Sequence, residues 1–103
     1  MEVERRRSTR RPMVLACTLH RRIGSPIRAR TRDLGPDGMC VDSARPLAVD
    51  ELLTFDLDLD GEPHVDGTVR VLRQQDLELY ALRFEALSEP KRGRLRELAV
   101  SPV

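Results

Sequence analysis

Aromatic residues are scarce in this chain. They make up 3% of its 103 residues, as two Phe, one Tyr and no Trp. Phe55 and Phe84 lie in apolar alternations and are expected in the core, which must otherwise be aliphatic. A sheet that stacks nucleic-acid bases needs exposed rings, so a nucleic-acid-binding small barrel is the least favoured of the binding functions that we consider.

The sequence also lacks metal-binding and catalytic signatures. Cys17 and Cys40 lie far apart in apolar runs, without the CxxC or Cys/His cluster that holds zinc. We expect both to be reduced core residues; a disulfide between them is the less favoured alternative. His20 and His64 are isolated, and no serine or cysteine lies in a nucleophile motif. We therefore expect no cofactor, no metal and no enzymatic activity.

One acidic stretch, Asp56–Gly61, copies the opening of a calcium-binding loop. The twelfth position, where such a loop needs a bidentate Glu, is Gly67, and Pro63 interrupts the stretch. We interpret these aspartates as the solvent-facing side of a strand.

Long apolar runs are missing as well. No stretch approaches the roughly 20 apolar residues of a membrane span. The segment after Arg10-Arg11 is interrupted by His20 and by Arg21-Arg22, which argues against a signal peptide. We expect a cytoplasmic protein without membrane contact.

Charge, by contrast, is abundant and unevenly distributed. The formal net charge is +1, yet residues 1–32 carry ten bases and two acids, whereas residues 33–89 carry four bases and fourteen acids. A basic N-terminus can hold a multiply charged anion. The nearly neutral whole favours a small phosphate ligand over a long duplex.

Apolar and polar residues alternate over most of the chain, which is the pattern of half-buried strands. The turn Gly24-Ser25-Pro26 joins the first two strands as a hairpin. In the second strand, one face carries Arg28, Arg30 and Arg32. The predicted strands are 13–20, 27–33, 39–41, 52–59, 65–72 and 77–84.

After Ser88 the apolar spacing changes to that of a helix. Ser88 is a suitable N-cap and Glu89-Pro90 suit a first turn, so a helix is expected at about 88–99. Residues 1–12 lack apolar periodicity and are expected to form a flexible, arginine-rich arm. Residues 13–103 are expected to form a single mainly β domain, a small antiparallel barrel with a C-terminal α-helix, because closure removes exposed strand edges.

Two segments carry possible ligand chemistry. The first is the arm, where Arg5, Arg6, Arg7 and Arg10 could form forked hydrogen bonds with phosphate; a solvated basic tail is the other interpretation. The second is the turn Asp33–Gly38, where an Asp could accept hydrogen bonds from a guanine edge and Gly38 could let a ligand approach the backbone. An ordinary turn between strands is the alternative.

The order of these segments resembles the PilZ family of cyclic di-GMP receptors. Arg6 and Arg10 fit its RxxxR element, although Arg7 and Arg11 have the same spacing, and Asp33 and Gly38 fit the ends of its (D/N)xSxxG element. The resemblance implies a six-stranded antiparallel barrel with a C-terminal helix. It also implies that Arg6, Arg10 and Asp33 bind cyclic di-GMP, that Arg5 and Arg7 assist, and that the arm folds onto the barrel.

The sequence departs from the family pattern at Gly35, where the family has serine. Losing one hydroxyl hydrogen bond costs about 1 kcal/mol, or up to about 3 if a ligand group stays buried and unpaired. That corresponds to roughly five- to a hundred-fold in affinity. We therefore expect weakened binding. The alternative is a family member that has lost the nucleotide and binds only a protein partner.

Overall fold

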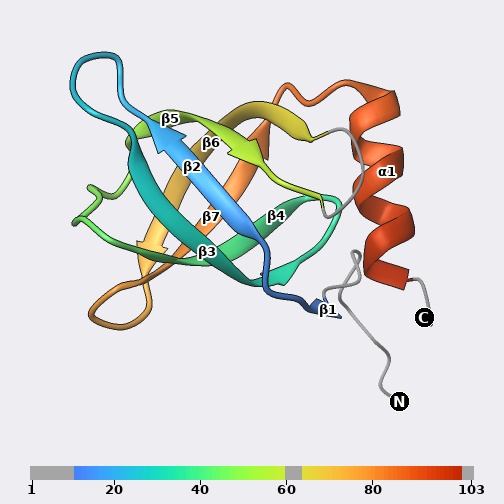
Figure 1. Ribbon diagram of the computed structural model, residues 1–103, viewed down its shortest axis with the longest axis horizontal. Helices are drawn as coiled ribbons and strands as arrows, with labels where there is room; N and C mark the ends of the chain where they lie inside the picture. Colours follow the sequence, from blue (N-terminus) through green and yellow to red (C-terminus); the bar gives the residue numbers. More distant parts are fainter. Residues whose placement is uncertain (1–10, 60–63, 101–103) are drawn as a thin grey trace.

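The computed structural model describes residues 11–59 and 64–100; residues 1–10, 60–63 and 101–103 lie outside the description. The described chain forms short strands followed by one helix (Figure 1). The elements are β1 (Arg11–Pro12), β2 (Ala16–His20), β3 (Ile27–Leu34), β4 (Gly38–Ser43), β5 (Leu52–Leu57), β6 (Val65–Gln74), β7 (Leu79–Glu85) and α1 (Glu89–Val100).

The strands close into a barrel. Their order is β1-β3-β2-β5-β6-β7-β4, and a further pairing of β3 with β4 joins the two ends. All pairs are antiparallel, so β2 to β7 form a closed six-stranded barrel and β1 adds to β3 outside it. The predicted antiparallel barrel with a C-terminal helix is confirmed.

The elements differ from the prediction mainly at their ends. The helix begins and ends one residue later than expected, at Glu89 and Val100. Strand β6 continues to Gln74 and β7 begins only at Leu79, because a register shift between Val71 and Arg73 carries the pairing further along the hairpin.

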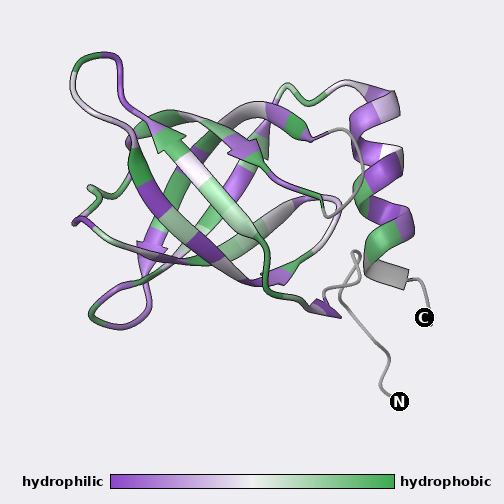
Figure 2. Cartoon of the chain, viewed as in Figure 1, coloured by the Kyte–Doolittle hydropathy of each residue, from purple (hydrophilic) through white to green (hydrophobic). Residues whose placement is uncertain are grey.

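Inward-facing residues form an aliphatic core. Hydrophilic and less hydrophilic residues alternate along β3 (Figure 2). The inward-facing residues of this strand are buried and its arginines are exposed. All three rings are buried as well: Phe55 and Phe84 pack with centroids 5.3 Å apart, and the Tyr80 hydroxyl accepts a hydrogen bond from Leu47 N at 3.2 Å. Cys17 and Cys40 are free and buried, as predicted.

The helix α1 covers one end of the barrel (Figure 1). Leu95 of α1 is fully buried and belongs to the barrel core, so the helix is held mainly by apolar packing. Ser88 caps it, because the Ser88 Oγ accepts a hydrogen bond from Lys91 N at 3.4 Å. In the described residues, no helix is long and apolar enough to cross a membrane.

Candidate ligand-binding site

The arm enters the barrel beside the predicted ligand-binding turn. In β1, Arg11 pairs with Leu34 and Pro12 with Asp33. The last two residues of the expected arm therefore belong to the sheet. Arg5, Arg6, Arg7 and Arg10 lie outside the described residues, but the chain that carries them starts next to Asp33.

A buried threonine holds the segment between β1 and β2 in place. The Thr31 hydroxyl is fully buried, donates to Met13 O at 2.5 Å and accepts from Leu15 N at 2.8 Å. Met13 N also donates to Arg32 O at 3.1 Å. These bonds fix the segment that follows the arm relative to the end of β3, because breaking them would leave buried polar groups unpaired.

The turn after β3 is compact and internally bonded. Gly35 N donates to Gly38 O at 3.0 Å, and Phe84 N donates to Asp37 O at 2.9 Å. Asp33 itself is half-buried at the end of β3, just after a register shift between Thr31 and Asp33. Such a bulge redirects side chains locally, so the carboxylate sits where the strand pairing is irregular.

Gly38 has a structural reason to be glycine. A Cβ at this position would lie 2.3 Å from Leu82 O in β7, so only glycine lets β4 and β7 approach this closely. The sequence predicts a role for Gly38 in ligand access. Close packing of the two strands is a separate requirement that the sequence does not reveal, because Leu82 is distant in the chain.

The helix α1 is also attached to this turn. Arg92 Nη1 donates to Pro36 O at 2.9 Å and to Asp37 Oδ1 at 3.2 Å. At the other end of α1, Arg11 Nη1 donates to Leu98 O at 3.2 Å. The sequence suggests only that Arg92 lies on the solvent side of a helix, since nothing local indicates contacts with residues so far away.

The outer face of β3 is basic and borders a groove of about 630 Å³. Arg28 and Arg30 line it together with Ala16, Thr18 and Asp42. Arg32, further along the same face, pairs with Asp42 at 3.1 Å. Within residues 11–59 and 64–100, neither the Arg28 nor the Arg30 side chain has a hydrogen-bonding or ion-pair partner. This face is therefore suited to an anion, a feature visible in sequence only as three alternating arginines.

Cys17, one of the two free cysteines, is not activated as a nucleophile. Burial raises the pKa of the Cys17 thiol to about 12, with nearby Asp56 adding to the shift, so it stays protonated and unreactive. No cluster of His, Cys, Asp and Glu that could hold a metal ion occurs in the part of the chain that the structure describes.

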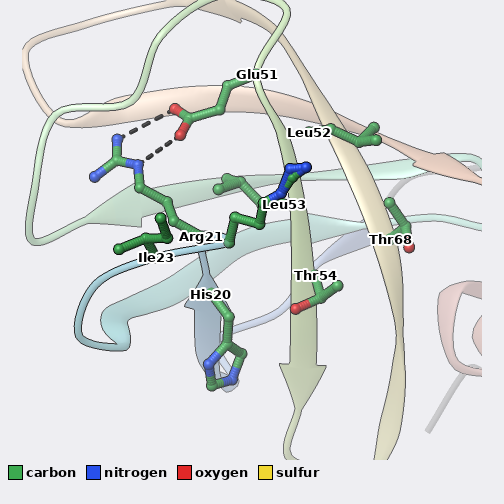
Figure 3. Close-up of a pocket in the computed structure, with 9 residues that line it drawn as sticks. His20, Arg21, Ile23, Glu51, Leu52, Leu53, Thr54 and Thr68 are labelled. Carbon is green, nitrogen blue, oxygen red and sulfur yellow. Dashed lines mark hydrogen bonds and ion pairs between the residues drawn. The ribbon is translucent and has the colours of Figure 1, made fainter.

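A second hollow, of about 730 Å³, lies at the end of the barrel away from the turn (Figure 3). It is lined by Ile23, Leu52 and Thr54 and by the paired Arg21 and Glu51. Of the predicted ligand-binding residues that the structure describes, none lines this hollow.

Comparisons with known proteins agree on the fold. The model of the PilZ domain family matches residues 4–101. A structure of the Bacillus subtilis inhibitor of motility, MotI/DgrA, superposes with a TM-score of 0.80 at 17% identity, covering 95% of this chain and 51% of that one. The chain thus spans about half the length of that protein. A PilZ domain of CeSA from a cellulose-synthesizing bacterium superposes with a TM-score of 0.68 at 18% identity, covering 87% of this chain and 93% of that domain.

No curated protein matches the sequence. The family model nevertheless covers the barrel, the helix and most of the arm, and the closed barrel is the one that the solved PilZ domain has. The chain belongs to the PilZ domain family, a family of cyclic di-GMP receptor domains.

Proposed function

We propose that this chain is a non-enzymatic regulatory module that binds cyclic di-GMP between its N-terminal arm and the turn Asp33–Gly38. The observation that carries the proposal is the pairing of β1 with the end of β3, which brings Pro12 opposite Asp33. The arm is thereby joined to the sheet beside the Asp33 carboxylate, and Arg10 directly precedes β1 in the sequence. The two motifs are far apart in sequence.

The chemistry of the ligand fits these groups. Cyclic di-GMP carries two phosphates, for which arginine forks are well suited, and each guanine edge offers two adjacent N–H donors to a carboxylate such as Asp33. Arg6 and Arg10 are proposed to hold the phosphates, with Arg5 and Arg7 assisting. The exposed arginines of β3 add positive charge beside the same strand end, and the arm folds onto the barrel when the ligand binds.

A protein-binding module that has lost the nucleotide is the second candidate. Gly35 favours it, since a serine hydroxyl is missing from the motif. The five arginines of the arm (Arg5, Arg6, Arg7, Arg10 and Arg11) argue against it. Binding of single-stranded nucleic acid is less favoured, because all three aromatic rings are buried and none can stack on a base.

Isothermal titration calorimetry of cyclic di-GMP into the chain tests the proposal, with GTP and linear pGpG as control nucleotides. We expect saturable binding of cyclic di-GMP alone, at micromolar affinity, and its loss in Arg10→Ala and in Asp33→Ala. His64→Ala is a matched control, because His64 is exposed and lies outside both motifs.

Two results would overturn the proposal. Absence of heat at high-micromolar ligand would favour the protein-binding alternative. Binding that is lost in Arg10→Ala, unchanged in Asp33→Ala and steeply dependent on salt would instead indicate nonspecific attraction of polyanions.

A further inference from the structure

The antiparallel topology gathers three connections at one end of the barrel. They join β2 to β3, β4 to β5 and β6 to β7. We call residues 20–27, 43–52 and 72–79 the loop end. The helix α1 and the β3–β4 turn lie at the opposite end (Figure 1), so the loop end is the mouth of the barrel that the helix does not cover.

Exposed apolar side chains are concentrated at the loop end. Of the six large apolar side chains that are exposed in the described residues, only Val14 lies elsewhere. Scattered exposed leucines are ordinary on protein surfaces, but gathering them at one end is typical of an interaction surface. The five at the loop end are Ile23 (85% exposed), Val49 (59%), Leu52 (51%), Leu72 (38%) and Leu77 (85%).

Two of the three loops that carry these side chains are tied to each other. Arg21 forms a two-pronged contact with Glu51, with Nε–Oε2 at 2.5 Å and Nη2–Oε1 at 3.1 Å, and Nη2 also donates to Pro46 O at 2.9 Å. Ala48 N donates to Glu51 Oε1 at 3.0 Å. The first two loops thus have a fixed relation, with Ile23 and Leu52 at the edge of the hollow between them (Figure 3). A preformed surface loses less entropy when a partner binds.

The charges at the loop end balance. Its formal net charge is zero, with four basic and four acidic residues. A surface with equal numbers of both signs does not repel a copy of itself and can pair opposite charges across a two-fold axis. The charged residues at this end are Arg21, Arg22, Arg45 and Arg73 against Asp50, Glu51, Asp76 and Glu78.

From this combination we infer that the loop end binds a second copy of this chain, forming a two-fold symmetric dimer. A standard interface buries about 800 Å² on each partner, which is about an eighth of the 6463 Å² surface of this chain. Strand β1 and helix α1 of each copy then lie away from the interface. The dimer therefore leaves both nucleotide sites open, and the inference does not rest on the proposed function.

Sedimentation equilibrium of the full chain, from about 5 to about 500 µM, measures the association. We expect the mass to rise from 11.7 kDa toward twice that value. The double variant Ile23→Asp/Leu52→Asp should raise the dissociation constant at least tenfold, because it places charge in the apolar contact. Both side chains are exposed, so folding should persist, and circular dichroism checks it.

Val14→Asp is the matched control, since Val14 is 67% exposed and lies outside the loop end. It should dimerise like the wild type. A chain that stays monomeric at all concentrations overturns the inference and leaves the loop end to a different partner. A dimer that survives the double variant, or one that Val14→Asp disrupts equally, overturns it too. None of these outcomes changes the result expected from calorimetry with cyclic di-GMP. The dimer and the proposed nucleotide binding are therefore tested independently.

Discussion

At the scale of single residues, the two glycines of the turn have different explanations. Gly38 is required by the backbone of β7, which lies 2.3 Å from where its Cβ would be. Gly35 is not required by its backbone angles, because among the described glycines only Gly24 has a positive φ. One glycine therefore serves the fold, whereas the other marks a change in the site.

Replacing Gly38 should destabilise the barrel. We expect Gly38→Ala to lower the free energy of unfolding by about 1–3 kcal/mol, since the added methyl group pushes β4 away from β7. Urea unfolding measures the change. Gly93→Ala is the control: a Cβ there meets nothing within 4 Å, and alanine in a helix should add up to about 1 kcal/mol. Equal effects of the two substitutions would contradict this explanation.

Replacing Gly35 should strengthen binding. Gly35→Ser restores the hydroxyl that the PilZ motif has at this position, so the affinity for cyclic di-GMP should rise roughly five- to a hundred-fold. Calorimetry on the variant and on wild type gives the ratio. If the serine variant binds no more tightly, the turn does not contact the ligand as proposed.

At the scale of elements, apolar alternation predicts strands β2 to β7, and the change to helical spacing predicts α1, although not all of their ends. Period-two patterns placed β3 and β5 because one face of each is buried. The short β1 was not predicted, since two residues have no periodicity and are held by pairing with Asp33 and Leu34. The contact of Arg92 with the turn was missed for the same reason: it joins residues 55 or more positions apart.

The link between α1 and the turn should affect ligand binding. Arg92→Ala removes the hydrogen bonds to Pro36 and Asp37, so the turn becomes less constrained and the affinity for cyclic di-GMP should fall several-fold. Calorimetry is again the measurement. Arg96→Ala, which removes a helix arginine whose nearest carboxylate, on Glu89, is 4.0 Å away, should change the affinity little; a similar loss in both variants would point to general charge.

At the scale of the whole molecule, surface ion pairs make the folding stability depend on pH in the acidic range. The hydrogen bond from Arg21 lowers the pKa of Glu51, and hydrogen bonds from Arg83 and Arg70 lower the pKa of Glu85. A carboxyl group with a lowered folded-state pKa stabilises the protein above its unfolded pKa, about 4.3 for Glu, and this stabilisation is lost as the pH falls through the folded pKa.

The melting temperature should therefore be nearly constant between about pH 7 and pH 5 and should decrease below about pH 4.3. Thermal unfolding followed by circular dichroism at a series of pH values tests this. In Arg21→Gln the decrease should be shallower, because the Glu51 pKa is no longer lowered. Arg28→Gln, which removes no carboxylate partner among the described residues, should follow the wild-type curve; a shallower decrease there would contradict the assignment.

The closed barrel and the basic end of the sequence could both be predicted, but their relation in space could not. Only the fold shows that Pro12, the last residue of the arm, lies opposite Asp33. Only the fold shows, too, that arginines of β3 border a groove. The concentration of apolar side chains at the loop end is equally invisible in sequence, because it depends on which loops the topology brings to the same mouth.

The most direct test of the central claim is the location of the ligand. Cyclic di-GMP titrated into ¹⁵N-labelled chain should shift the amide signals of Gly35 and Gly38 and those of Met13 and Leu15, which follow the arm in the sequence. The amide of Gly24, at the loop end, should not move. Shifts confined to the loop end, or none at saturating ligand, would contradict a nucleotide site between the arm and the turn.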